Sequence, residues 1–331
     1  MTLEEFLAEW RNDSPTLLVH TSGSTGTPKP ILVDKQRMQV SARMTCGFLG
    51  LKPGDSALLC LPLDYIAGKM MVVRALCCDL QLVCVEPGGH PLASDDMPPL
   101  SFAAMVPLQV YNSLQVPQEC LRLRSIGNLI IGGGAVDESL ASQLRSFPHA
   151  VWSTYGMTET LSHIALRRLS GPQASEWYVP FEGVSLSLTP DQCLVVDAPA
   201  VCDRPLVTND VAMLRPDGSF RILGRIDNVI CSGGVKIQAE QVEALLMPRL
   251  PGVGICVTSI PDVRLGEALT LLVAGADATS LTALCRQQLP RYWQPRHILP
   301  VASLPLTPTG KIARAEARRM ALQLFSEAGE K

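Results

Sequence analysis

Short apolar runs alternate with segments of helical spacing over residues 1–150, and this alternation limits the possible fold more than any other feature of the chain. The runs end at Gly, Pro or polar residues, as buried strands do, whereas the segments between them place apolar residues three and four positions apart, as helices do. Such a chain favours an α/β fold in which helices cover both faces of a sheet. The predicted strands are 17–19, 57–61, 82–85 and 128–131, and the predicted helices are 35–48 and 137–147.

The pattern changes twice after this region. Residues 184–188 and 194–196 alternate apolar and polar side chains, and Arg215-Pro-Asp-Gly218 has the composition of a hairpin turn, which predicts a small β unit. Beyond Arg225 we expect a small α+β domain, with helices at 238–246, 280–289 and 311–325 and an apolar strand at 253–259. A length of 331 residues is consistent with about two domains.

Composition excludes several classes of protein. Lys and Arg total 28 against 31 Asp and Glu, and this net charge of −3 gives no electrostatic footprint for nucleic acid. The 11 cysteines lie without a C-x-x-C pair, which predicts buried free thiols in a reducing compartment. The N-terminus lacks the pattern of a signal peptide, and Lys69, Arg74 and Asp79 interrupt the most apolar stretch. We therefore expect a soluble, cytoplasmic protein without membrane insertion.

The segment after the first predicted strand carries the strongest local signal for a ligand. Residues 21–29 contain two glycines, five hydroxyl side chains and one lysine. Glycines let backbone N–H groups converge on an anion, hydroxyls add donors and lysine adds charge, a combination that suits a polyphosphate. A surface turn is the alternative, because the same residue types are common in loops. The predicted nucleotide-binding residues are Thr21, Ser22, Gly23, Ser24, Thr25 and Gly26, followed by Lys29 as a catalytic cation.

This segment resembles the phosphate loop of the adenylate-forming superfamily, which comprises acyl-CoA ligases, adenylation domains of peptide synthetases and luciferases. Further segments similar to the family's motifs follow in the family's order. The resemblance implies a large N-terminal domain, built from a layered α/β sheet and a small β subdomain, and a small mobile α+β C-terminal domain. It places the AMP-binding domain at 1–224, a hinge at 225–228 and the C-terminal lid domain at 229–331. Members usually have more residues before the phosphate loop, so we expect a shortened N-terminal domain.

The segment Tyr155-Gly156-Met157-Thr158-Glu159-Thr160 resembles the family's Tyr-Gly-x-Thr-Glu motif. An aromatic ring suits stacking on adenine, a hydroxyl suits the α-phosphate, and a carboxylate suits the Mg²⁺ that accompanies ATP. The resemblance implies nucleotide contacts for Tyr155 and Gly156, and catalytic roles for Thr158 and Glu159, with Glu159 as the metal ligand. A helix cap is the alternative for a Glu in this position.

Two more segments are similar to nucleotide-binding motifs. A glycine-rich segment after a predicted strand places Gly133, Gly134 and Ala135 next to the adenine and the acyl group by resemblance, and a tight strand-to-helix turn is compatible with this. The motif Thr-Gly-Asp occurs here with Asn209 in place of Gly, and implies that Asp210 accepts hydrogen bonds from the ribose. Asn tolerates the left-handed backbone conformation, so the departure is mild.

The C-terminal third contains the hinge motif, the Gly-Lys motif and the predicted coenzyme A loop. The resemblance implies that Arg225 contacts the ribose and that the backbone dihedrals of Asp227 change when the C-terminal domain turns. The Gly-Lys motif near the C-terminus implies that Lys311 binds the acyl carboxylate and the α-phosphate during adenylation. The residues expected to bind coenzyme A are Ser232, Gly233 and Gly234.

The acyl pocket is predicted from a shorter stretch. Tyr65 stands where many members have His, and residues 153–164 resemble the o-succinylbenzoate–CoA ligases of menaquinone synthesis. That substrate has two carboxylates and a ketone, so its pocket needs a donor or cation away from the reacting acid. Surface cations on a helix and a hydrogen-bonded core histidine are the alternative. The predicted acyl-substrate residues are Tyr65, Lys69, Arg74, Thr160, Ser162 and His163.

These motifs predict a two-step ligase that uses ATP, Mg²⁺ and coenzyme A. The carboxylate of a small acid attacks the α-phosphorus of ATP and releases pyrophosphate, and the thiol of coenzyme A then attacks the acyl-adenylate and releases AMP. Two alternatives stay open: delivery of the acyl group to a carrier protein, and a nucleotide-binding relic without catalysis. The expected partners are the acid, ATP and coenzyme A, with no nucleic acid, and a homo-oligomer stays open.

Overall fold

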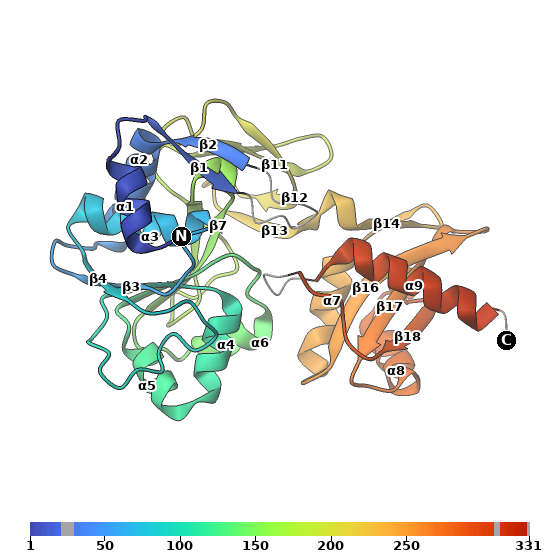
Figure 1. The fold of residues 1–331 in the computed structure, drawn as a ribbon. Helices are drawn as coiled ribbons and strands as arrows, with labels where there is room; N and C mark the ends of the chain where they lie inside the picture. Colours follow the sequence, from blue (N-terminus) through green and yellow to red (C-terminus); the bar gives the residue numbers. More distant parts are fainter. Residues whose placement is uncertain (21–29, 308–311, 330–331) are drawn as a thin grey trace. The chain divides into compact units, whose positions relative to one another are not determined.

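The structure is a computed structural model that describes residues 1–20, 30–307 and 312–329. The chain divides into two compact units (Figure 1). The N-terminal unit consists of Met1–Ser187, Val195–Val207 and Leu214–Arg221. The C-terminal unit consists of Leu188–Leu194, Thr208–Met213 and Ile222–Lys331.

A largely parallel sheet runs through the N-terminal unit in the order β4-β3-β5-β6-β7-β8-β9. Neighbours from β4 to β7 pair in parallel, whereas β8 pairs antiparallel with both β7 and β9. The predicted strands 57–61, 82–85 and 128–131 are β3, β4 and β6, so the predicted α/β fold class is confirmed. The strands are β3 (Ser56–Leu59), β4 (Gln81–Cys84), β5 (Phe102–Met105), β6 (Asn128–Ile131), β7 (Ala150–Gly156), β8 (His163–Arg168) and β9 (Val179–Pro180).

Helices cover both faces of this sheet, as its buried apolar strands require. Figure 1 shows α1, α2 and α3 on one side of β3 and β4, and α4, α5 and α6 on the other. The predicted helix 35–48 is α2, which Asp34 caps at its N-terminus and which ends at Gly50 in the left-handed conformation. The helices are α1 (Leu3–Arg11), α2 (Lys35–Leu49), α3 (Ile66–Cys78), α4 (Pro107–Gln115), α5 (Pro117–Ser125) and α6 (Glu138–Leu144).

The first predicted strand lies outside the main sheet. It is β1 (Thr16–His20), which pairs antiparallel with β2 (Pro30–Asp34) in a separate hairpin. Leu17 and Val19 are buried and Leu18 is exposed, so one face of this hairpin packs on the unit and the other faces solvent. The strand predicted at 17–19 is therefore present, but the expectation that it is buried is only partly correct, because its side chains alternate between core and solvent.

The predicted small β unit is a sheet with the order β10-β11-β12-β13. Its predicted turn is present, because Gly218 N donates to Arg215 O at 3.0 Å and Arg215 N donates to Ser219 O at 2.8 Å. The division between the two compact units runs through this sheet. Its strands are β10 (Ser185–Leu188), β11 (Cys193–Asp197), β12 (Leu206–Leu214) and β13 (Phe220–Arg225).

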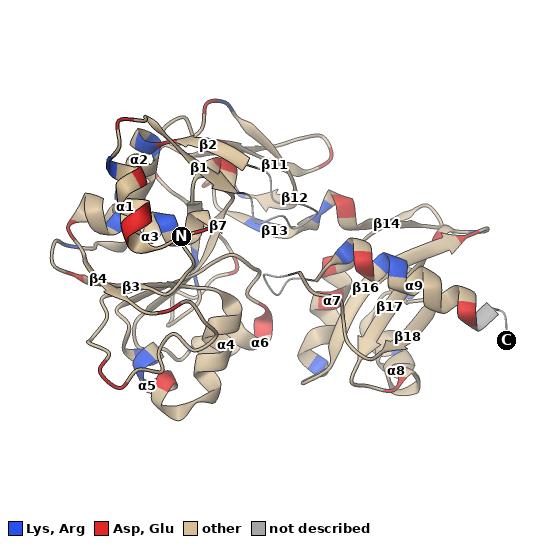
Figure 2. Ribbon diagram, viewed as in Figure 1, with Lys and Arg blue, Asp and Glu red and all other residues tan. Residues whose placement is uncertain are grey.

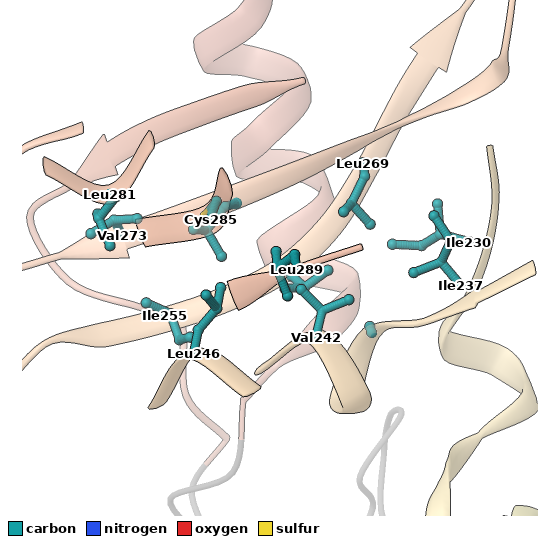
Figure 3. Packing of buried hydrophobic residues seen from close by; sticks show 13 residues of the cluster. Ile230, Ile237, Val242, Leu246, Ile255, Leu269, Val273, Leu281, Cys285 and Leu289 are labelled. Carbon is teal, nitrogen blue, oxygen red and sulfur yellow. The ribbon is translucent and has the colours of Figure 1, made fainter. Parts of the chain in front are cut away.

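The C-terminal unit has a second core built on a sheet with the order β15-β14-β17-β16, with β18 beside β17. Strand β16 alternates between two clusters. Ile255 packs with residues of α7 and α8 (Figure 3), and Val257 belongs to the same cluster. Cys256 packs instead with Ala317 and Ala321 of α9. The elements are β14 (Val229–Ser232), β15 (Val235–Gln238), α7 (Ala239–Leu246), β16 (Gly254–Asp262), β17 (Gly266–Ala274), α8 (Ala278–Gln288), β18 (His297–Val301) and α9 (Arg314–Gly329).

Charged residues of both signs are interspersed along α9 (Figure 2), where Arg318 pairs with Glu267 of β17 at 2.9 Å. All 11 cysteines are free thiols, and six of them are buried, while Cys84 and Cys231 are exposed. The prediction of uniformly buried thiols is therefore only partly correct. Among the helices of the described residues, none has the length and apolar character needed to cross a membrane.

Candidate active site

The two segments with the strongest sequence signals lie outside the described residues. The flanking residues are described: His20 and Pro30 are paired in the β1–β2 hairpin, and His20 also forms a parallel bridge with Tyr65. Tyr65 therefore lies beside the last residue before the predicted phosphate loop. The predicted residues in the undescribed segments are Thr21, Ser22, Gly23, Ser24, Thr25, Gly26, Lys29 and Lys311.

The carboxyl ends of β6 and β7 bring two predicted motifs together. The strands pair in parallel, so the glycine-rich segment that follows β6 lies beside Tyr155 at the end of β7. A Cβ at Gly132 would lie 2.6 Å from Thr154 Oγ1, and Gly133 has a φ of +75°, so this turn depends on glycine. Gly134 and Ala135 follow in the same turn before α6. Ligands of open α/β sheets bind at the carboxyl ends of strands.

The turn between β7 and β8 is tight and internally hydrogen-bonded. A Cβ at Gly156 would lie 2.3 Å from Ser162 O and 2.4 Å from His163 Cα, so only glycine fits there. Thr160 Oγ1 accepts a hydrogen bond from Met157 N at 3.0 Å and donates to Ser162 O at 2.6 Å. The buried Thr160 hydroxyl thus shapes the turn that carries Thr158 and Glu159, whereas its predicted contact with the acyl substrate stays a prediction.

Tyr155 belongs to an aromatic cluster. Its ring lies 5.1 Å from the ring of Phe220, edge to face, and 6.0 Å from that of Tyr178. Tyr178 and Phe220 stack at 5.4 Å, and Ser153 Oγ lies 2.9 Å from the Tyr178 hydroxyl. These contacts fix the plane of Tyr155, which a stacking platform for a base requires.

Glu159 is exposed at the tip of the turn, while Thr158 beside it is buried. No group of three or more His, Cys, Asp or Glu residues in the described part of the chain could hold a metal ion by itself. A single exposed carboxylate fits Mg²⁺ that arrives with ATP, because Mg²⁺ commonly binds one or two carboxylates together with substrate phosphates and water. Glu159 would hold that ion against the phosphates.

Arg74 of α3 is almost completely buried, with 2% of its surface exposed. It donates to Ser162 Oγ at 2.6 Å, and its Nε has no hydrogen-bond partner in the structure. No salt bridge to Arg74 occurs within the described residues. Burial lowers the pKa of Arg74 to about 10, so it stays charged at neutral pH. A buried cation without a carboxylate is costly unless an anion is bound beside it.

His163 adjoins this arginine and is neutral. Its Nε2 lies 3.1 Å from Thr45 Oγ1 and its Nδ1 lies 3.2 Å from Ser162 Oγ. Burial, followed by the charge of Arg74, lowers the pKa of His163 well below its ordinary value. The interpretation of His163 as a hydrogen-bonded core histidine agrees with these contacts, although Ser162 links it directly to Arg74.

Lys69 is buried like Arg74, but its contacts are elsewhere. Its Nζ lies 5.1 Å from the centre of the Phe6 ring and 3.0 Å from Met1 Sδ, both in the N-terminal segment. Burial lowers the pKa of Lys69. Five residues along a helix correspond to about 140° of rotation, so Lys69 and Arg74 face different neighbours. The interpretation of the two as surface cations is wrong, since each is 2% exposed.

The predicted ribose and hinge residues meet in the C-terminal unit. Arg225, at the end of β13, lies 3.3 Å from Asp210 of β12 and donates to Asp227 at 2.8 Å. Asn209 Nδ2 donates to both carboxylate oxygens of Asp227, at 3.1 and 3.0 Å. Burial raises the pKa of Asp227, but the hydrogen bonds from Arg225 and Asn209 outweigh it and leave the pKa below its ordinary value.

The predicted coenzyme A loop is the turn of the β14–β15 hairpin. Ser232 pairs with Val235, and the two turn residues, Gly233 and Gly234, have φ values of +58° and +82°. Two consecutive left-handed residues form the turn that matches the twist of a hairpin, and glycine adopts it without strain. Gly233 N donates to Leu265 O at 2.9 Å, which fixes the loop on the C-terminal unit.

A groove of about 990 Å³ opens beside this loop, within the C-terminal unit. Ser232 and Gly233 line one end of it. Three exposed arginines line it as well, and no Asp or Glu of the described residues does. Tyr292, 71% exposed, adds an aromatic ring. The arginines are Arg286, Arg291 and Arg296.

The arrangement of these motifs agrees with the comparison with known families. A family model described as AMP-binding enzyme matches residues 4–199, more than half of the chain, and one described as AMP-binding enzyme C-terminal domain matches residues 241–311. The chain belongs to the AMP-binding enzyme family.

This AMP-binding enzyme is similar to relatives with different names. It is 36% identical to a solved structure described as an acyl-CoA synthetase (AMP-forming)/AMP-acid ligase II-like protein from Dyadobacter fermentans, with a TM-score of 0.65, covering 98% of this chain and 92% of that one. It is 27% identical to 2-succinylbenzoate–CoA ligase of Haemophilus influenzae, over 70% of this chain and 53% of that protein. It is also 27% identical to feruloyl-CoA synthase of an Amycolatopsis species, over 93% and 70%.

The coverage and identity values bear on the length of the chain and on the choice of acid. The chain spans about half the length of the Haemophilus ligase. Relatives named for two different acids are equally identical to it, so overall similarity does not select the acid.

Three residues that contact the candidate site of this AMP-binding enzyme were not predicted from the sequence. Tyr178 and Phe220 hold the ring of Tyr155, and Thr45 of α2 holds His163. None of the three belongs to a predicted motif, although Phe220 lies in the same strand as Arg225. A local motif cannot reveal them, since they are brought to the site by strand and helix pairing.

Proposed function

We propose that the chain is an AMP-forming acid–CoA ligase that activates a small carboxylic acid with ATP and transfers it to coenzyme A. The observation that supports this most is the convergence at the carboxyl ends of β6 and β7, where the glycine turn, Tyr155 and Glu159 adjoin the buried Arg74–Ser162–His163 cluster. The carboxyl ends of these strands would thus offer a base platform, a carboxylate for Mg²⁺ and, through Ser162, a buried cation.

The best candidate for the acid is one that carries a second negative group, and o-succinylbenzoate fits this description. Arg74 supports the choice, because it is buried, charged and without a carboxylate among the described residues. Ser162 and the neutral His163 add short polar contacts that suit a ketone oxygen. Lys69 takes no part in this subsite, because Phe6 and Met1 cover it.

Coenzyme A is favoured over a carrier protein as the acyl acceptor. The groove beside Ser232 and Gly233 has three arginines and no acidic lining residue among those described. Free coenzyme A ends in a phosphorylated ADP group, whereas the phosphopantetheine of a carrier protein does not. Arginines suit phosphate groups and the ring of Tyr292 suits adenine, so the groove matches the part of coenzyme A that a carrier protein lacks.

The role proposed for each residue is the one that the family resemblance implies. Tyr155 would hold the adenine, Asp210 and Arg225 the ribose, and Glu159 the Mg²⁺ that offsets phosphate charge during adenylation. The buried cluster around Arg74 would orient the acid so that its other carboxylate faces the α-phosphorus. Thr21–Thr25 and Lys29 would bind the departing pyrophosphate, and Lys311 would offset charge on the bridging oxygens, as the family resemblance implies.

Pyrophosphate release from ATP tests this function. A panel of aryl and fatty acids that includes o-succinylbenzoate should give release with at least one acid, and coenzyme A should then yield a thioester. Lys311→Ala should abolish adenylation but leave thioester formation from prepared acyl-adenylate largely intact. Absence of pyrophosphate release with every acid would favour the nucleotide-binding relic, and adenylation without thioester formation would favour a carrier protein.

A further inference from the structure

The contact between Asn209 and Asp227 is an unusual feature of the predicted hinge. One amide group of Asn209 bridges both oxygens of the Asp227 carboxylate, at 3.1 and 3.0 Å. The motif that this segment resembles has glycine in place of Asn209, and glycine has no side chain with which to make the contact. The bridge is therefore a property of this chain's own residue.

The other hydrogen bonds of the hinge residues are made by residues that follow the hinge in the sequence. Gln238 Nε2 donates to the Arg225 carbonyl at 2.8 Å, and Asn228 donates to Glu240. Gln238 and Glu240 follow the hinge, whereas Asn209 precedes it. A change in the φ of Asp227 moves its side chain relative to Asn209, which precedes it, so the contact with Asn209 must break or re-form. The contact between Gln238 and the Arg225 carbonyl also crosses Asp227, whereas Asn228 and Glu240 both follow it and can stay in contact.

The same carboxylate also links the hinge to the predicted ribose residues. Arg225 donates to Asp227 at 2.8 Å and lies 3.3 Å from Asp210. Asn209 and Asp210 are adjacent in β12, so both strand residues act on one side of this network. The position of Asp227 is thus coupled to the group that would bind the ribose.

We propose that Asn209 is a positioning residue of the hinge: it holds the Asp227 carboxylate in one of the two hinge conformations and so sets the balance between the two half-reactions. This inference rests on the proposed two-step function. A hydrogen bond present in only one of two states shifts their equilibrium by its full net strength. Loss of the amide therefore favours the half-reaction served by the other conformation and slows the one served by this conformation.

The test compares Asn209→Ala with the wild type in each half-reaction. Adenylation is followed as pyrophosphate release with o-succinylbenzoate, and thioester formation is followed with synthetic o-succinylbenzoyl-adenylate and coenzyme A. The two rates should change in opposite directions, so that their ratio shifts at least about threefold, in line with the lower end of the net strength of a hydrogen bond, as suits an exposed contact. Asn209→Gln, which keeps the amide, should return the ratio toward the wild-type value.

Hydrogen exchange supplies a readout that needs no substrate. Backbone amides of residues 225–229 should exchange at least about threefold faster in Asn209→Ala than in the wild type. The matched control is Asn112→Ala, which removes another exposed side-chain amide, one that donates to Gly89 O at 3.1 Å far from the hinge along the chain. It should leave both the ratio and the exchange unchanged.

The outcomes separate this inference from the proposed function. Equal exchange in the wild type and in Asn209→Ala, or two half-reactions that change by the same factor, would overturn the role of Asn209. A wild type that forms neither the adenylate nor the thioester with any acid would overturn the proposed function, and the exchange experiment would still decide whether Asn209 holds the hinge.

Discussion

Glu243 of α7 holds Arg314 of α9 through two parallel hydrogen bonds, 2.8 and 2.7 Å long, and the pair is partly buried within the C-terminal unit. Both partners also bind the backbone of the same residue of β16, because Glu243 accepts from Val257 N at 2.7 Å and Arg314 donates to Val257 O at 3.0 Å. Burial raises the pKa of Glu243 although Arg314 opposes it. The pair anchors the start of α9, three residues after Lys311.

Removal of one partner should destabilise the C-terminal unit strongly. We expect Glu243→Ala to lower the free energy of unfolding by about 2 kcal/mol, because the partly buried guanidinium of Arg314 loses two charged hydrogen bonds and keeps only the longer contact with Glu240 at 3.8 Å. Urea denaturation followed by tryptophan fluorescence measures this, since Trp293 packs against the core of this unit. The control is Arg319→Ala on the exposed side of α9, which should change stability by less than about 0.5 kcal/mol. Similar losses in both variants would contradict the prediction.

A second prediction concerns the turn between β7 and β8. Gly156→Ala should lower stability by about 1–3 kcal/mol, because the added Cβ would overlap backbone atoms of Ser162 and His163. It should also weaken ATP binding measured by calorimetry, since the turn positions Tyr155 and Glu159. Gly47→Ala in α2 is the matched control: a Cβ there meets nothing within 4 Å, so helix propensity should raise stability by about 0.5–1 kcal/mol. Equal effects of the two substitutions would show that the close contact does not matter.

The third prediction is a pH dependence of stability. Burial and the charge of Arg74 hold the pKa of His163 well below 6.5 in the folded chain. The unfolded chain then binds one more proton than the folded chain below this value, so stability is full above about pH 6.5 and falls as the pH drops toward the folded pKa. The loss should reach up to about 1.4 kcal/mol per pH unit.

Denaturation at pH 7.5, 6.0 and 5.0 checks this dependence. His163→Asn should be less stable than the wild type at pH 7.5 but should lose less stability on acidification. The control is the exposed His149→Asn, whose pH profile should run parallel to that of the wild type. A profile of His163→Asn parallel to the wild type would assign the acid sensitivity to other groups.

The elements predicted most accurately from the sequence are those with a clear boundary signal at each end. Strand β6 was predicted with its observed limits, because Gly127 and Gly132 flank a four-residue segment in which three consecutive residues are apolar. Helix α1 was missed, although Thr2 and Glu5 form a capping box that is visible in the sequence. Strand β5 has only four residues and no periodic pattern, so local reasoning could not find it. The pairing of β1 with β2 could not be predicted, because residues 21–29 separate the two strands and no local pattern specifies such a pairing.

The site was predicted by residue type but not by environment. Tyr155 and Glu159 were found in a motif and Arg74 by its place after Tyr65, whereas Tyr178 and Phe220, which contact the ring of Tyr155, lie outside the predicted motifs. The sequence does contain a signal for the burial of Arg74. Helix α3 is apolar on nearly all sides, and a helix of this kind is buried together with its few cations.

The last prediction separates the two buried cations of α3. Arg74→Met should raise KM for o-succinylbenzoate at least about tenfold and leave KM for ATP unchanged, because it removes the cation that would pair with the distal carboxylate. With 4-oxo-4-phenylbutanoate, which keeps one carboxylate and the ketone but lacks the ring carboxylate, the same substitution should have little effect. Lys69→Met is the matched control, since Lys69 lies against Phe6 and should not contact the acid. Pyrophosphate release measures all three. A rise in KM with Lys69→Met and none with Arg74→Met would show that the subsite lies on the other face of α3. Equal changes in KM for both acids with Arg74→Met would show that Arg74 supports the fold and does not bind the second carboxylate.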